Sequence, residues 1–231
     1  MQSRLTILVI AFVPIALAAQ NGPQPPTELP TTAVARLASS LAAARTHPTH
    51  IWRDMQARNS DETVNAYIEI PRGDRRKWEY EMRINGRALD RVMPEDVGGY
   101  PINYGYVPQT ISYDGDPFDV LVLGPALPGG RAVRGIPVGL LRMEDEKGLD
   151  SKVVLSPVDD AGRPTHALTA GEQRQVGDYF RRYKQHEPGK FSKVAGWGNA
   201  ADGLAFVSIA HTFFRECRQR VDRPCRVVRP R

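Results

Sequence analysis

Two groups of acidic residues are of the type that binds divalent metal ions. Residues 113–120 contain three aspartates within six positions, Asp114, Asp116 and Asp119, where a turn enters an apolar strand pattern. A second group, at 144–150, follows another strand pattern. Carboxylate oxygens are hard ligands that suit Mg²⁺, together with water and phosphate oxygens. Each group alone is typical of a solvated turn, but together they predict a metal site that attracts a polyanion.

Other common site motifs are missing from the sequence. It contains no P-loop, no G-x-G-x-x-G and no G-x-S-x-G pattern. His186-Glu187 lacks the second histidine of a zincin helix, and the five histidines are scattered, so a zinc site is not predicted. An EF-hand loop starting at Asp114 is excluded, because Asp119 and Pro125 stand where Gly and Glu are needed.

Cationic and aromatic residues lie upstream of the acidic groups. The segment 77–82 alternates, so Lys77 and Glu79 share one strand face opposite three apolar side chains. Arg91 stands in a strand-edge pattern beside Asp90, and residues 100–106 hold three tyrosines. Taken singly, these features indicate a salt-bridged strand face, an edge ion pair and an aromatic core turn.

Short strands followed by helices are expected to position these groups. The predicted strands, separated by turn residues, are 65–71, 77–83, 88–92, 118–123, 134–142 and 152–157. Helical spacing is found at 32–45, around 176–183, and from 199 to about 218. This order favours an α+β fold, a small barrel with packed C-terminal helices, over a doubly wound sheet.

Composition and charge indicate a globular body with a basic tail. The chain of 231 residues is 41% hydrophobic and 25% charged, which excludes wholesale disorder. Its net charge of +5 is uneven, because 215–231 contain seven arginines and two acidic residues, whereas 19–214 contain 23 basic and 24 acidic residues. Cys217 and Cys225 lie in the tail. A disulfide there would clip the tail without touching the core, and two free thiols are the alternative.

The N-terminal residues have the features of a secretory signal peptide. Arg4 precedes 14 uncharged residues, and Ala16-Leu17-Ala18 offers a cleavage pattern. Fourteen helical residues reach only ~21 Å, short of the ~30 Å hydrocarbon layer. We therefore expect a periplasmic or secreted protein, cleaved near Ala18, without a membrane span. The predicted segments are a signal peptide at 1–18, a Pro-rich linker and helix at 19–63, a catalytic domain at 64–214 and a basic tail at 215–231.

The order of these blocks resembles the soluble family I inorganic pyrophosphatases over about residues 67–214. The family signature D-G-D-P-x-D-V stands at 114–120. Six flanking blocks match in the same order, at 68–71, 77–79, 89–91, 100–106, 145–152 and 183–184. The resemblance implies a five-stranded OB-like β-barrel with flanking helices, and bacterial members of the family are commonly hexamers.

The resemblance also implies Mg²⁺-dependent hydrolysis of pyrophosphate to two phosphates. Asp114, Asp119 and Asp150 would bind the Mg²⁺ pair that activates water, with Asp119 bridging both ions. Asp145, with Asp150, would hold a further Mg²⁺, and Glu69 would act on a metal through water. Such ions can lower the pKa of bound water from about 15.7 toward ~7.

Further roles follow from the same resemblance. Asp116 is the implied general base, which takes a proton from the attacking water. The implied phosphate-contacting residues are Lys77, Arg91, Tyr104, Lys152, Tyr183 and Lys184. Supporting positions beside them are Glu79, Tyr100 and Glu146. Lysine and arginine around the leaving group would stabilise its charge as the P–O bond breaks.

Two other classes of function share some of these features. A nucleic-acid binder would fit an OB-like barrel and a basic tail. The nearly neutral body argues against it, and the acidic clusters at the site would repel a phosphate backbone. Another metal phosphohydrolase, acting on nucleoside triphosphates or polyphosphate, would use the same kinds of residue. Substrate preference separates it from a pyrophosphatase.

Overall fold

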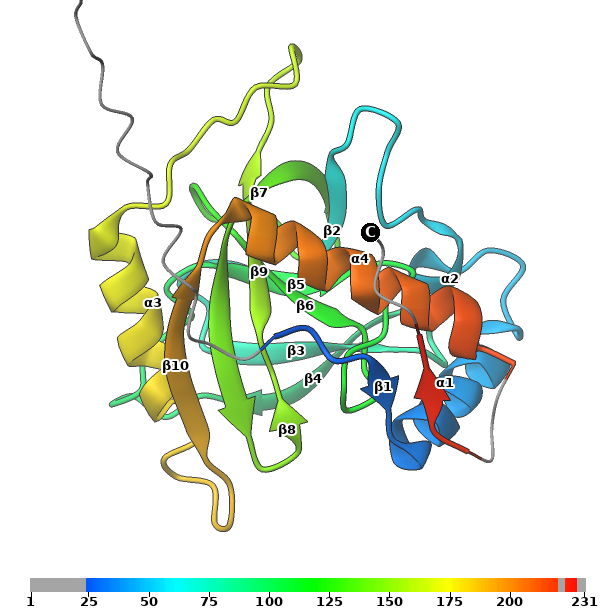
Figure 1. Ribbon diagram of the computed structural model, residues 1–231. Coiled ribbons are helices and arrows are strands. Elements are labelled where there is room, and N and C mark those ends of the chain that lie inside the picture. Colours follow the sequence, from blue (N-terminus) through cyan, green and yellow to red (C-terminus); the bar gives the residue numbers. More distant parts are fainter. Residues whose placement is uncertain (1–23, 220–222, 228–231) are drawn as a thin grey trace, which may run out of the picture.

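A mixed seven-stranded sheet forms the centre of an α+β fold (Figure 1). The computed structural model describes residues 24–219 and 223–227, so the predicted signal peptide lies outside the described residues. The strands are β2 (Val64–Ile70), β5 (Asn103–Val107), β6 (Phe118–Val122), β7 (Ala132–Asp145), β8 (Gly148–Leu149), β9 (Lys152–Pro157) and β10 (Ser192–Gly198). They are ordered β10-β7-β2-β5-β6-β9, and β8 pairs with β7.

The long strand β7 connects the two halves of this sheet. It pairs antiparallel with β2, with β9 and with β10. Because β6 also pairs with β9, in the parallel direction, the strands β7, β2, β5, β6 and β9 pair in a cycle. The parallel pairing matters for the site, because Val120 of β6 lies opposite Val153 of β9. The ends of the two acidic segments are thereby brought together.

A separate hairpin carries the predicted cations. It consists of β3 (Arg76–Glu81) and β4 (Gly86–Val92), which form a two-stranded antiparallel sheet. Lys77 and Arg91 are direct cross-strand partners in this hairpin. Since opposite residues in an antiparallel pair are neighbours on one face, the register alone places the two cations side by side.

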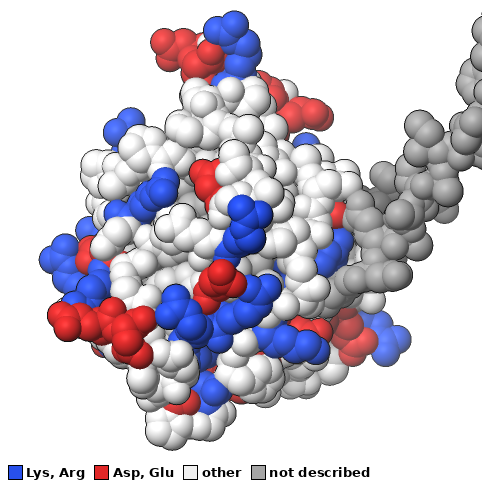
Figure 2. Space-filling model, turned by 90° about the vertical axis from the view of Figure 1, so that its left-hand side faces the viewer, with Lys and Arg blue, Asp and Glu red and all other residues white. Residues whose placement is uncertain are grey.

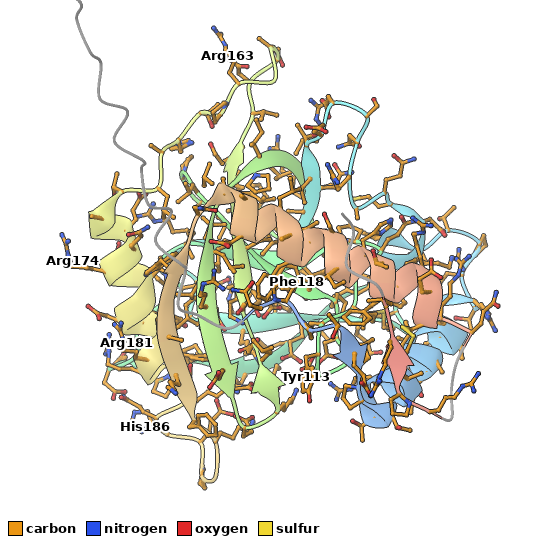
Figure 3. All side chains as sticks on the ribbon, in the orientation of Figure 1. Tyr113, Phe118, Arg163, Arg174, Arg181 and His186 are labelled. Atoms are coloured by element: carbon orange, nitrogen blue, oxygen red, sulfur yellow. A yellow bond between two sulfur atoms is a disulfide. The ribbon has the colours of Figure 1, made fainter. Side chains whose placement is uncertain are left out.

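Two C-terminal helices cover the sheet. In Figure 1, α4 (Ala200–Cys217) crosses the sheet and α3 (Ala170–Arg182) lies beside β10. Both helices begin with a capping box, formed by Thr169 with Glu172 and by Asn199 with Asp202. The apolar face of α4 packs on β7 and β9. In Figure 3, Phe118 lies behind α4, where its ring stacks on that of Phe206 at 6.2 Å.

The N-terminal segment and the tail are joined to each other. Figure 1 shows β1 (Glu28–Leu29) beside β11 (Cys225–Arg226), with α1 (Thr31–Ala44) and α2 (Ile51–Asp54) on the same side of the molecule. Residues 28–29, predicted as linker, therefore form a strand that pairs with the tail. Within the described part of the chain, no helix is both long and apolar enough to cross a bilayer.

The predicted disulfide between Cys217 and Cys225 is present. The expectation that it would not touch the core is wrong, because both cysteines are fully buried. They lie in one apolar cluster with Leu29 and Leu37 of the N-terminal segment and with Trp52. The reason is that α4 continues to Cys217 and brings the sulfur under α1, which tail composition alone does not indicate.

Removing this disulfide is expected to destabilise the protein. In the chain-entropy account, opening a loop of this size costs about 2–3 kcal/mol of unfolding free energy. Urea titration of a Cys217→Ser/Cys225→Ser variant should show that loss, and the reduced wild-type protein should behave like the variant. Peptide mapping without reductant that recovers two alkylatable thiols, or equal unfolding free energies, would contradict the prediction.

The six predicted strands and three predicted helices are confirmed, although α3 begins at Ala170, six residues before the predicted helical pattern. Among the described residues, five strands were not predicted: the two-residue strands β1, β8 and β11, and the longer strands β5 and β10. Residues 103–107 were interpreted as part of an aromatic turn, yet they form β5, buried on both faces. Gly105 allows this pairing, because a Cβ atom there would lie 1.8 Å from the Tyr67 carbonyl oxygen of β2. The other longer strand, β10, contains three apolar residues among glycine and polar ones, and has no clear alternation.

Candidate active site

One cavity gathers the predicted site residues. It has a volume of about 820 Å³ and opens between the hairpin, the sheet, the end of α3 and α1. All fifteen predicted residues line it: Glu69, Lys77, Glu79, Arg91, Tyr100, Tyr104, Asp114, Asp116, Asp119, Asp145, Glu146, Asp150, Lys152, Tyr183 and Lys184. The cavity walls therefore alternate between carboxylates and cations.

A buried lysine joins two of the carboxylates. The Lys152 Nζ atom donates to Asp119 Oδ2 at 2.5 Å and to Asp150 Oδ1 at 2.8 Å. Lys152 is 1% exposed and lies over the rings of Tyr104 and Phe180. Burial would lower the pKa of Lys152, but the two carboxylates outweigh it and raise that pKa. Burial raises the pKa of Asp150 to about 7, helped by the Asp119 charge and opposed by Lys152.

The signature turn holds a second pair of carboxylates. Asp114 Oδ1 accepts from Ser112 Oγ at 2.8 Å and from the Asp116 backbone N–H at 3.1 Å. Gly115 between them has φ +91°, a conformation that favours glycine. Lys147 Nζ lies 3.1 Å from Asp114 Oδ2 and 3.8 Å from Asp116 Oδ2.

The two carboxylates of this turn titrate differently. Burial raises the pKa of Asp116 to about 7, and the charge of Asp114 adds to the rise. Burial opposes ionisation of Asp114 as well, but Lys147 and the hydrogen bonds of the turn lower its pKa to about 2. Two close carboxylates shift one another in this way because their charges repel. Asp116 is thus the member of the pair that can take up a proton near neutral pH.

A third cluster lies where the end of α3 meets β7. Lys184 Nζ donates to Asp145 Oδ2 at 2.7 Å and to Glu146 Oε2 at 2.9 Å. Lys184 is only 8% exposed, and Tyr183 beside it is the C-cap residue of α3. By contrast, Arg174 and Arg181 of the same helix point outward in Figure 3. The helix therefore delivers its last residues to the cavity and keeps its other cations outside.

The hairpin supplies the opposite wall. Lys77 Nζ donates to Glu79 Oε1 at 2.5 Å and to Asp90 Oδ2 at 3.2 Å. The guanidinium of Arg91 also binds Asp90 and reaches Glu187. Glu69 of β2 is 8% exposed and accepts from the Tyr80 backbone N–H at 2.6 Å; burial raises its pKa.

Several groups at the cavity were not assigned from the sequence. Asp90 lies beside Arg91, and Lys147 lies within the acidic group at 144–150. Their position next to predicted site residues was the only sign in the sequence that they belong to the cavity. Arg36 of α1 lies far away in sequence, yet its Nη1 atom is 2.6 Å from Asp116 Oδ2. No pattern in residues 32–45 indicated this contact, because it depends on how α1 packs.

The donor set of the cavity fits hard divalent cations. Among the described residues, no three His, Cys, Asp or Glu side chains are gathered as ligands of one ion. The carboxylates instead converge in pairs on single ammonium groups, those of Lys152, Lys147 and Lys184. Oxygen-only donors that already converge on a positive charge suit Mg²⁺. Burial raises the pKa values of Asp150 and Glu69, and a cation bound nearby would lower them again.

The outer surface, like the cavity, carries charges of both signs. On the face shown in Figure 2, acidic side chains lie next to basic ones in several groups. In the described tail, Arg226 binds Glu28 of β1 at 2.5 Å.

Comparisons with known proteins show to which family the chain is similar. Residues 66–215 match the family model described as inorganic pyrophosphatase. The inorganic pyrophosphatase of Sulfolobus acidocaldarius is 35% identical over 160 residues, which are 66% of this chain and 92% of that protein. The crystal structure of inorganic pyrophosphatase from Thermus thermophilus has a TM-score of 0.65 and 34% identity, covering 71% of this chain and 98% of that one. The structure of an inorganic pyrophosphatase from Coxiella burnetii has a TM-score of 0.64 and 36% identity, covering 69% of this chain and 99% of that one.

Proposed function

The chain belongs to the inorganic pyrophosphatase family and hydrolyses inorganic pyrophosphate, and we propose that it does so with Mg²⁺ and the fifteen cavity residues. The observation that carries this proposal is the convergence of carboxylate pairs and cations on one cavity. Carboxylates suit the metal, and lysine and arginine suit the phosphate oxygens.

The carboxylates are proposed to hold the metal ions. The ligands would be Asp114, Asp119, Asp145 and Asp150, with Glu69 acting through water. When bound, Mg²⁺ ions neutralise phosphate charge and lower the pKa of a water molecule toward ~7. Lys152 and Lys184, which now bind these carboxylates, are then free to donate to phosphate oxygens instead.

The remaining residues are proposed to bind substrate and move a proton. Asp116 accepts the proton of the attacking water. Its pKa near 7, raised by burial and by Asp114, supports this role because a general base works best near the operating pH. Phosphate oxygens are bound by Lys77, Arg91, Tyr104, Lys152, Tyr183 and Lys184. These donors stabilise the charge that develops on the leaving phosphate.

Supporting positions hold the binding residues in place. Glu79 fixes Lys77 and Glu146 fixes Lys184 through the ion pairs described above. Tyr100 is 1% exposed and its ring packs against Tyr104 at 5.5 Å. We further infer that the scaffold is a five-stranded OB-like barrel, supported by the cycle of pairings among β7, β2, β5, β6 and β9.

Substrate preference is the test of this function. We expect kcat/KM for Mg-pyrophosphate to exceed that for ATP, tripolyphosphate and p-nitrophenyl phosphate by at least about 10²-fold, because a compact polar site leaves its donors unpaired with a poorer substrate. Phosphate release is measured for each substrate, and Asp116→Asn protein from the same purification reveals contaminating phosphatases. Equal or better use of a triphosphate would favour the other metal phosphohydrolase.

Export and assembly complete the proposal. We infer a periplasmic or secreted protein whose signal peptide ends near Ala18, supported by the sequence of 1–18 and by the disulfide in the structure. N-terminal sequencing of the protein from its native cells tests this. The homo-oligomer, a hexamer by family resemblance, stays a prediction that native mass spectrometry checks. The segment boundaries at 18, 63 and 214 also stay predictions.

A further inference from the structure

One face of α1 lines the active-site cavity, although α1 lies outside the residues that match the family. The residues on this face are Arg36, Ser39, Ser40 and Ala43. Their spacing of three, four and seven positions is that of one helical stripe. A neighbouring stripe, which includes Val34, Leu37 and Leu41, is buried in the apolar cluster. The helix thus presents one side to the core and another to the cavity.

The backbone of α1 rests directly on the signature turn. A Cβ atom built on Gly115 would lie 2.8 Å from the Ala33 carbonyl oxygen and 2.9 Å from Arg36 Cβ. Gly115 is therefore the residue type that permits the helix to approach this closely. This contact fixes the Cα and Cβ atoms of Arg36 next to the signature turn that carries Asp116.

The position of α1 is fixed at its N-terminal end and by the apolar cluster behind it. Leu29 of β1, which immediately precedes the helix, is fully buried, and β1 pairs with β11. In turn, β11 is bound to α4 through the disulfide of Cys217 and Cys225. Behind the helix, Trp52 packs edge-on to Phe214 of α4 at 5.2 Å. The helix is thus a built-in wall of the cavity, held by the core and by a covalent clip.

We propose that Arg36 is a positioning residue for pyrophosphate hydrolysis, acting through Asp116. The proposal rests on the role of Asp116 as general base given above. Arg36 Nη1 binds Asp116 Oδ2 at 2.6 Å, and Lys147 Nζ lies 3.8 Å from the same oxygen. Two cations from different elements therefore hold one oxygen of this carboxylate. A fixed carboxylate takes the proton more often than one that samples several rotamers.

The ion pair is suited to positioning more than to stability. The side chains of Arg36 and Asp116 are 46% and 48% exposed, and exposed ion pairs contribute little to folding. Since α1 is held by its apolar stripe and by the clip, losing the guanidinium should leave the fold intact. The loss should be visible in turnover.

Kinetics of Arg36 variants test the proposal. Arg36→Met keeps the aliphatic stem that packs on the signature turn and is expected to lower kcat about 10-fold with KM changed less than about 2-fold, because orientation is lost and binding is kept. Arg36→Lys should recover part of the lost turnover. Arg45→Ala, an exposed arginine at the C-cap of the same helix, is the matched control and should leave kcat unchanged.

A double-mutant cycle with Asp116→Asn separates this inference from the proposed function. Adding Arg36→Met to Asp116→Asn should cause no further loss, because the group that Arg36 positions is already disabled. An equal loss in both backgrounds, an unchanged kcat, or a raised KM at constant kcat would overturn the positioning role. Full activity of Asp116→Asn alone would instead refute the proposed base. Circular dichroism checks that each variant is folded. If Arg36→Met does not fold, the same double-mutant cycle is measured with Arg36→Lys.

Discussion

Replacing Asp116 by asparagine is expected to lower kcat for pyrophosphate about 10²–10⁴-fold, the range that general base catalysis contributes. Asparagine has nearly the same shape, and the backbone N–H of this residue continues to donate to Asp114. What is lost is the ability to accept a proton near neutral pH, which burial and the Asp114 charge give to this carboxylate. The chemistry should therefore fail while the turn persists.

Binding and folding separate this outcome from a general disturbance. Arg36 and Lys147, the cationic partners of Asp116, have side chains that are 46% and 48% exposed, so they remain hydrated when the charge of Asp116 is removed. KM should change little, and the thermal midpoint should stay near that of the wild type. Asp160→Asn, an exposed carboxylate in a surface turn, is the matched control. If the Asp116→Asn protein keeps more than a tenth of wild-type turnover, Asp116 is not the general base.

The sequence predicted the location of the site residues because they lie in a few contiguous segments. Asp114, Asp116 and Asp119 are fixed relative to one another by a turn and the start of β6, whatever the rest of the chain does. Turn patterns of this kind are specified by local residues. Lys152 was placed with them only by the resemblance to the family, because the parallel pairing of β6 with β9 joins segments that are distant in sequence.

The contribution of α1 could not be predicted in the same way. The period of 32–45 shows that a helix forms and which stripe is apolar, but not which surface that stripe covers. That surface is assembled from Leu29, Trp52, the end of α4 and the tail, which are distant in sequence. For the same reason the disulfide was expected at the surface and is found in the core. Arg36 could be identified only after this packing was known.

Removing divalent metal ions is expected to lower hydrolysis by at least about 10³-fold, because ordinary water with a pKa near 15.7 supplies far less hydroxide at neutral pH than activated water with a pKa near ~7. Dialysis against EDTA followed by a phosphate-release assay measures the loss. Excess Mg²⁺ should restore the rate, whereas KCl at equal ionic strength should not. EDTA that is already saturated with Mg²⁺ serves as the control for the chelator. Undiminished turnover after complete chelation would contradict the metal assignment.

The same treatment should make the stability of the protein depend on pH in a defined direction. Burial raises the pKa of Asp150 from 3.8 to about 7 and also raises that of Glu69. Between pH 4 and pH 7 the folded metal-free protein keeps protons on these carboxyl groups that the unfolded chain releases. The stability that the protonated carboxyl groups contribute is therefore lost as pH rises from about 4 through 7. Bound Mg²⁺ favours the ionised carboxylates and opposes that loss. The difference in thermal midpoint between Mg²⁺-loaded and EDTA-treated protein should therefore be larger at pH 8 than at pH 5. A difference that shrinks with rising pH would mean that these carboxylates do not face the metal.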